Sequence, residues 1–178
     1  MKNLKGTKTE QNLINAFRGE SEARNKYTFF ASKAKKEGFV RISKIFEETA
    51  NNEKEHAKIW FKLINQIGST EENLQISVDA EGYEAEEMYP EFAKTAREEG
   101  FEDIAKLFEN IATVETEHGK RYKKLLSNLK NDEEFVSDKQ EQWICLNCGY
   151  IHNGKDAPEI CPLCSHKREY FTRKQENY

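Results

Sequence analysis

The motif Glu-x-x-His occurs twice in the chain, as EKEH at residues 53–56 and as ETEH at residues 115–118. Residues three apart on an α-helix lie on one face, so each motif presents a carboxylate and an imidazole in the same direction. Both motifs lie beside apolar residues at helical spacing, which directs them toward a core. Because a buried carboxylate is costly unless a cation accompanies it, two such pairs in one bundle require positive charge. The pattern therefore predicts a two-metal site that contains Glu53, His56, Glu115 and His118.

The chain has four cysteines, and all of them lie between residues 145 and 164. They form two Cys-x-x-Cys motifs, and two such motifs place four thiolates around one tetrahedral ion. Gly149 suits the tight turn that follows Cys148, and Pro162 suits the equivalent turn after Cys161. The spacing alone leaves the metal open, since structural zinc ribbons use it too. The predicted ligands are Cys145, Cys148, Cys161 and Cys164.

Aromatic residues around the cysteines predict a miniature core for this tail. Trp143, Tyr150 and Phe171 are its expected members. Two histidines, His152 and His166, also lie in the tail. Because four sulfurs already fill a tetrahedral site, we interpret both histidines as surface residues.

Periodic apolar residues predict the helices that carry the two Glu-x-x-His motifs. One helix is expected from residue 9, with Thr9 able to cap it, to about residue 36, and a second over residues 39–64. The helical pattern is lost from residue 66 to about residue 78, which predicts a crossover loop. Two further helices are expected over residues 80–99 and from 101 to about 129.

These four helices form an internal repeat. When residues 27–64 are compared with residues 89–126, 18 of 38 positions are identical. Gly38 and Gly100 supply the equivalent turns. Two related hairpins joined by a long connection are what a four-helix bundle of the ferritin type needs. The expected fold is mainly α-helical, with the bundle over residues 1–130, a linker over 131–142 and a small metal-binding domain with short β-hairpins over 143–178.

The other two helices should each supply an inward glutamate. In the first helix Glu20 and Glu22 are available, and the neighbouring apolar residues favour Glu20. The repeat sends Glu20 to Gly82, one place from Glu81, and a one-residue bulge in a helix would absorb this mismatch. Glu84, one turn from Glu81, would be an additional carboxylate. The candidates in the third helix are Glu81, Glu84, Glu86 and Glu87.

Tyr27 and Tyr89 also occupy equivalent positions in the repeat. Both suit a core position, and we expect their hydroxyl groups to donate hydrogen bonds to carboxylates that bind metal.

Composition excludes several classes of function. The chain has 178 residues, of which 37% are hydrophobic and 34% charged, with nine Gly and three Pro, and this balance favours long amphipathic helices. The net charge of -4 is spread along the chain, which argues against nucleic acid as a partner. The sequence shows neither an apolar run of roughly 18 residues nor an apolar block near its first residues. We therefore expect a cytoplasmic protein.

Taken together, these motifs resemble those of a known family. The sequence resembles a rubrerythrin across nearly its whole length, with a bundle first and a rubredoxin-like tail second. The matching segments, in order, are GES at 19–21, EKEH at 53–56, EGYEAEEMYP at 81–90, ETEH at 115–118 and the CLNCGY…APEICPLC tail.

The resemblance implies the identity of the metals and their ligands. It implies two iron ions in the bundle and one iron ion in the four-cysteine site. Glu20 and His56 would bind the first bundle iron, Glu81 and His118 the second, and Glu53 and Glu115 would bridge them. Glu84 would bind the first iron when the pair is oxidised and yield to His56 on reduction.

The resemblance also implies an activity and partners. The reaction would be reduction of hydrogen peroxide to water in protection against oxidative stress. Electrons would come from NAD(P)H through a rubredoxin or a separate reductase, and the four-cysteine iron would relay them. Family members form dimers in which the tail of one subunit approaches the bundle of another, so a homodimer is expected.

Two other functions compete with this one. The first is a ferroxidase or iron-storage role, which would need neither an electron relay nor a seventh ligand. The second is a structural zinc ribbon attached to a metal-buffering bundle without catalysis. Visible absorption separates this second function from the relay, because iron bound by sulfur is coloured and zinc bound by sulfur is not.

Overall fold

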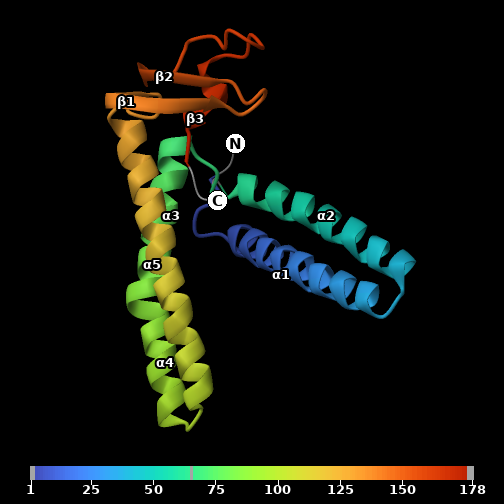
Figure 1. Ribbon diagram of the computed structural model, residues 1–178. Helices are drawn as coiled ribbons and strands as arrows, with labels where there is room; N and C mark the ends of the chain where they lie inside the picture. The colour runs from blue at the N-terminus through green and yellow to red at the C-terminus, as the bar shows by residue number, and fades with distance from the viewer. Residues whose placement is uncertain (1–2, 65, 176–178) are drawn as a thin grey trace. The chain divides into compact units, whose positions relative to one another are not determined.

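The computed structural model describes residues 3–64 and 66–175, and it divides into two compact units at residues 68 and 69. The first unit holds one helical hairpin; the second holds another hairpin and a small antiparallel sheet (Figure 1). The expected mainly helical fold with short β-structure at its C-terminal end is confirmed.

The first hairpin consists of α1 (Lys8–Lys36) and α2 (Val40–Leu63). The turn between them contains Gly38, whose φ of 87° lies in the left-handed region that favours glycine. The expected cap at Thr9 is wrong: Thr7 caps the helix, because its side chain accepts a hydrogen bond from the backbone N–H of Glu10.

The second hairpin consists of α3 (Thr70–Tyr83), the π-helical turn η1 (Glu84–Met88), α4 (Tyr89–Glu98) and α5 (Glu102–Lys130). Its turn repeats that of the first hairpin, since Gly100 has a φ of 85°. In each hairpin the phenylalanine after the turn glycine donates its N–H to an alanine carbonyl, over 2.9 Å for Phe39 and 2.7 Å for Phe101. The internal repeat is therefore also a repeat of local structure.

The predicted crossover loop over residues 66–78 is wrong for most of its length. Helix α3 begins at Thr70, because Ser69 and Glu72 form a reciprocal capping box. The Ser69 side chain accepts the N–H of Glu72, and the Glu72 carboxylate accepts the N–H of Ser69. Only residues 64–69 then separate α2 from α3. The connection between the hairpins is short, where a long one was expected.

The predicted bulge is present. The five-residue π-helical turn η1 interrupts the third helical segment between Glu81 and Tyr89. A π-helical turn inserts one extra residue into a helix. Seven positions separate Glu20 from Tyr27, and eight separate Glu81 from Tyr89. The extra residue in η1 thus restores the repeat at the expected glutamate.

Small side chains fill the space between the helices of each hairpin. The buried apolar residues there are Ala31, Ala34, Ala50, Ala57, Ala93, Ala96, Ala105 and Leu126. Three aromatic rings pack together in equivalent places, with centroids 5.7–6.3 Å apart for Tyr27, Phe30 and Phe46. Tyr89, Phe92 and Phe108 occupy the equivalent positions of the repeat in the second hairpin. Their ring centroids are 5.6–6.3 Å apart.

The small sheet is antiparallel, with strand order β2-β1-β3. Its strands are β1 (Val136–Cys145), β2 (Ile151–Asp156) and β3 (Phe171–Arg173), and the short helix η2 (Arg168–Tyr170) precedes β3. Trp143 and Phe171 are buried, and Tyr150 packs against them, so the predicted miniature core is confirmed. The Trp143 indole N–H donates to the carbonyl of Gly154, which satisfies its polar group.

The division into domains at residues 130 and 143 stays a prediction. Strand β1 begins at Val136, inside the expected linker, and residues 1, 2, 65 and 176–178 of the predicted domains lie outside the described residues. Among the helices that the structure describes, none is long and apolar enough to cross a membrane.

The capping box gives a first testable prediction. Ser69→Ala should lower the free energy of unfolding by about 1 kcal/mol, because the N–H of Glu72 loses the side-chain oxygen that accepts its hydrogen bond. Ser69→Asp keeps an acceptor at the same position and should retain most of the stability. Chemical denaturation measures the loss, and faster hydrogen exchange of the Glu72 amide in Ser69→Ala locates it. Equal stability of the two variants would show that the helix does not depend on this cap.

Candidate metal centres

Helices α1 and α2 bring together one glutamate and one Glu-x-x-His motif. His56 Nδ1 lies 2.8 Å from Glu53 Oε2 on its own helix and 3.9 Å from Glu20 Oε1 on the facing helix. Both carboxylates are half-buried, whereas Glu22 points into solvent and pairs with Lys26. The structure thus favours Glu20 over Glu22, as the apolar pattern predicted.

Helices α3 and α5 repeat this arrangement in the second hairpin. His118 Nδ1 lies 2.7 Å from Glu115 Oε2 and 3.5 Å from Glu81 Oε2. Burial raises the pKa of Glu81, and the hydrogen bond and negative charge of Glu115 raise it further, while His118 opposes the shift. The side chains that we predicted from spacing therefore lie in two equivalent clusters, one in each hairpin.

Glu84 and Tyr89 lie close to the second cluster. Glu84 is half-buried in η1, and its negative charge helps to raise the pKa of Glu81. Burial raises the pKa of Tyr89, and the charges of Glu84 and Glu115 add to this shift. Tyr89 consequently keeps its phenolic proton and remains a hydrogen-bond donor beside the carboxylates.

The remaining candidates are placed differently. Glu86 and Glu87 are exposed on η1. Tyr27 is half-buried within the aromatic trio of the first hairpin, the position equivalent to that of Tyr89. Whether its hydroxyl supports a ligand carboxylate stays a prediction.

Each cluster has the donors and spacing that a divalent ion needs. In both, two carboxylates and one imidazole offer donor atoms that all lie within 4.8 Å of one another. An ion with bonds of about 2.1 Å holds its donors roughly 3–4 Å apart, so small side-chain movements suffice to bind it. Four carboxylates also carry four negative charges, which two divalent cations would balance. The donor set thus fits two metal ions.

The four cysteines of the tail lie around one point. Cys145 Sγ lies 3.7 Å from Cys164 Sγ, and Cys148 Sγ lies 3.6 Å from Cys161 Sγ. A tetrahedral ion with metal–sulfur bonds of about 2.3 Å holds its sulfurs roughly 3.8 Å apart. The sulfurs therefore already have nearly the spacing of a filled tetrahedral site.

Backbone geometry makes the two cysteine motifs equivalent. The N–H of Gly149 donates to the carbonyl of Cys145 over 2.8 Å, and the N–H of Ser165 donates to that of Cys161 over 2.9 Å. Gly149 and Ser165 both adopt a positive φ, of 75° and 60°. Sequence inspection identified Gly149 but missed Ser165, although both lie four residues after the first cysteine of a motif. The tight turn thus tolerates a non-glycine residue in the second motif.

The electrostatics of the four sulfurs also favour a cation. The backbone N–H of His166 stabilises the Cys164 thiolate and lowers the pKa of that thiol to about 6. The N–H of Tyr150 acts in the same direction on Cys148, but burial and the other three thiols outweigh it and raise the pKa to about 12. Ionisation of one sulfur therefore opposes ionisation of the next, and a bound cation removes this conflict.

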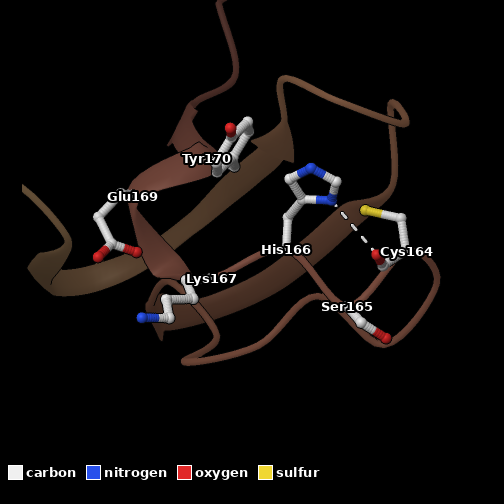
Figure 2. A pocket seen from close by; sticks show the side chains of 6 residues that line it. All are labelled: Cys164, Ser165, His166, Lys167, Glu169 and Tyr170. Atoms are coloured by element: carbon white, nitrogen blue, oxygen red, sulfur yellow. Dashed lines mark hydrogen bonds between the residues drawn. The ribbon is translucent and has the colours of Figure 1, made fainter.

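A pocket lies beside Cys164, lined by Ser165, His166, Lys167, Glu169 and Tyr170 (Figure 2). His166 Nδ1 lies 3.3 Å from the Cys164 carbonyl oxygen, and its ring meets the Tyr170 ring edge-on with centroids 4.3 Å apart. His166 is half-buried rather than fully exposed. The two inner sulfurs, Cys145 and Cys161, are buried, so the site approaches the surface through Cys148 and Cys164.

Comparison with known proteins adds independent findings. The family model described as Rubrerythrin matches residues 11–126 and 72–146, and that described as Rubrerythrin, rubredoxin-like domain matches residues 143–172. Rubrerythrin-1 of Clostridium acetobutylicum is 47% identical and covers 100% of both chains. Rubrerythrin of Nitratidesulfovibrio vulgaris is 46% identical and covers 96% of both chains. A solved structure described as the partially reduced state of nigerythrin is 31% identical and covers 97% of this chain and 89% of its own, with a TM-score of 0.36.

The family models fall on the two parts of the chain that hold the clusters. The Rubrerythrin model spans both hairpins with their glutamate and histidine clusters, and the rubredoxin-like model spans the four cysteines. Family members hold a di-iron site in a ferritin-like bundle and one further iron in the rubredoxin-like domain, and both donor sets are present here. On matches of this extent and identity, the chain belongs to the rubrerythrin family.

Proposed function

We propose that this chain is a cytoplasmic peroxidase that reduces hydrogen peroxide to water with electrons from NAD(P)H. Rubrerythrins are generally peroxide-reducing di-iron proteins of oxidative stress. The observation that supports the proposal here is the coexistence of two donor clusters of equal composition with a four-sulfur site that has no vacant position. The first arrangement suits chemistry on a small molecule, and the second suits electron transfer.

The glutamate and histidine clusters would hold the reacting pair of ions. We assign Glu20 and His56 to one iron and Glu81 and His118 to the other. Glu53 and Glu115 would bridge the two, since each is the less exposed carboxylate of its cluster. Two ferrous ions supply one electron each, which matches the two electrons needed to cleave one O–O bond. With two protons, one peroxide then yields two water molecules.

Glu84 is the seventh proposed ligand of this pair. The four carboxylates of the clusters balance two divalent ions, and oxidation of the ions adds positive charge. A fifth carboxylate nearby would compensate this charge, in exchange for the neutral His56. Tyr89 would hold the neighbouring carboxylates in place, because its raised pKa keeps it a donor.

The four-sulfur iron would relay electrons one at a time. Four sulfurs leave the ion no position for a substrate, so transfer of charge remains its only role. Leu146 and Leu163 lie within the two cysteine motifs and are exposed, 68% and 66%. Such a surface suits a rubredoxin or an NAD(P)H-dependent reductase as the electron donor, and Cys148 and Cys164 lie on the less buried side of the site. We further propose that the active form is a homodimer.

Removal of a bridging carboxylate tests the site. Glu53→Gln should reduce steady-state peroxide consumption by about 100-fold or more, because a neutral amide cannot balance two cations. Glu55→Gln is the matched control, since Glu55 lies two residues away, is exposed and pairs with Lys58. Its rate should stay within about twofold of the unmodified protein. Equal rates for the two variants would contradict the assignment.

Removal of a sulfur tests the relay. Cys161→Ser should abolish peroxide consumption that is driven by NAD(P)H and a reductase, because the buried Cys161 completes the four-sulfur site. The chemically reduced protein should still consume one peroxide per bundle site in stopped-flow measurements. Persistent NAD(P)H-linked turnover in this variant would exclude the relay. A colourless four-sulfur site in the unmodified protein would instead indicate the zinc alternative.

Glu84 can be tested through the reduction potential of the bundle pair. Glu84→Gln should raise this potential, because the oxidised pair loses an anionic partner. Glu86→Gln is the control, since Glu86 is exposed on the same π-helical turn. A redox titration that follows the bundle iron measures the shift. Coincident titration curves for the two variants would remove Glu84 from the ligand set.

A further inference from the structure

The connection between the two hairpins is too short for the bundle that this family builds. A ferritin-like bundle has one long crossover connection, because its two hairpins open at opposite ends of the bundle. In this chain, residues 64–69 are all that separates α2 from α3. The capping box fixes this boundary, since Ser69 is both the last residue of the connection and the N-cap of α3.

The span that the connection would have to cross follows from the ligand positions. The cluster on α2 lies seven to ten residues before Leu63, which is about 13 Å at 1.5 Å per residue. Glu81 lies eleven residues after Thr70, about 16 Å along α3. If both clusters meet at one level in a ferritin-like bundle, the two helix ends lie about 29 Å apart along its axis. A sideways step of about 9 Å between neighbouring helices adds to this span.

The chain available for this span is much shorter. The N–H of Ile64 donates to the carbonyl of Trp60 over 3.1 Å, and the N–H of Gln66 donates to that of Phe61 over 3.2 Å. These bonds hold Ile64 and Gln66 against the end of α2. Four residue steps then lead from Gln66 to Thr70, and they reach at most about 14 Å when fully extended. The deficit of roughly 15 Å is far larger than any side-chain adjustment.

The alignment lengths agree with a shortened chain. The alignment with Rubrerythrin-1 of Clostridium acetobutylicum extends over 195 positions, whereas this chain has 178 residues and is covered completely. About 17 of those positions are therefore gaps in this chain.

Each hairpin nevertheless needs a second hairpin. Between its own helices it buries mainly alanines, whereas large apolar residues are exposed. On the first hairpin these include Ile42, Ile45 and Ile59, with exposures of 47%, 53% and 50%. On the second they include Leu107 and Val114, with exposures of 60% and 51%. Each hairpin also holds only part of the proposed ligand set, with one three-residue cluster on each and Glu84 on the second.

We propose that the bundle forms between two copies of the chain, with the first hairpin of each copy paired with the second hairpin of the other. Two bundles then lie side by side, and the short connection has only to step sideways from one to the other. Short connections favour such exchange of elements, and a two-fold axis closes the assembly as a dimer. Every metal pair takes Glu20, Glu53 and His56 from one copy and Glu81, Glu84, Glu115 and His118 from its partner copy. This inference rests on the proposed two-metal site.

Complementation between two defective chains tests this exchange. One variant carries Glu53→Gln and His56→Gln, and the other carries Glu115→Gln and His118→Gln. They are unfolded together, refolded and loaded anaerobically with ferrous iron. In a mixed dimer, one bundle combines both damaged hairpins and the other combines both intact hairpins. Random pairing therefore restores about one quarter of the bundle sites, which adds about half an iron per chain after gel filtration.

The controls separate the two proposals. Each variant refolded alone should retain only the iron of the four-sulfur site, and circular dichroism should show that both variants are helical. The unmodified protein should retain three irons per chain. If it does so while the mixture gains none, each chain closes on itself and the exchange is wrong. If the unmodified protein retains only one iron, the two-metal site itself is wrong, and the exchange falls with it.

A longer connection between the hairpins provides a second test. It changes the length of the connection and leaves the ligand substitutions of the two variants as they are. Insertion of twelve Gly and Ser residues between Ile67 and Gly68 lets the second hairpin reach the first within one chain. At micromolar protein, closure within the chain should then win, since a short tether gives a millimolar effective concentration. Iron gained by complementation should fall at least about tenfold when both variants carry the insertion. An undiminished gain would overturn the proposal, because the short connection would not be its cause.

Discussion

The main physical constraint on this protein is the repulsion between carboxylates that lie close together among packed helices. Glu20 with Glu53, and Glu81 with Glu115, place negative charges within a few ångströms of each other on half-buried surfaces. The raised pKa of Glu81 records the cost of this arrangement in the absence of a cation. Metal ions convert that cost into binding energy, so the helices need only hold the ligands at the correct spacing.

The repeat explains how one short sequence meets this constraint twice. Each hairpin supplies the same turn glycine, aromatic trio, glutamate and Glu-x-x-His motif. The two copies differ at η1, which adds one residue and carries Glu84. A π-helical turn changes the direction of neighbouring side chains without ending the helix, and so it provides a further carboxylate beside an otherwise symmetric site.

In the four-sulfur site, too, groups that become negatively charged lie close together. Its sulfurs come from two tight turns, and the backbone N–H groups of those turns stabilise thiolates. A sheet of three short strands around Trp143 and Phe171 holds the turns together. So small a domain has little apolar surface to bury, and a bound metal supplies much of the stability that a larger core would give.

The sequence by itself determined the ligand types, their helical faces and the need for a bulge. These features depend on covalent spacing and on the 3.6-residue period, and both can be counted along the chain. The mismatch of the repeat at Gly82, for example, pointed to a bulge and to the neighbouring Glu81, and the resemblance to rubrerythrins then assigned Glu81 as a ligand. The four-cysteine site followed from two Cys-x-x-Cys motifs.

Only the tertiary structure decided that residues 70–79 are helical and how closely Glu20 approaches His56. The weak apolar pattern after residue 66 resembled a loop, although Ser69 and Glu72 carry a capping-box signal, because packing against α5 stabilises residues that show little amphipathic period. The approach of Glu20 to His56 joins positions 36 residues apart, and it is set by how α1 packs on α2. Distances across a packed interface depend on side-chain volumes on both helices, and spacing along one helix does not encode them.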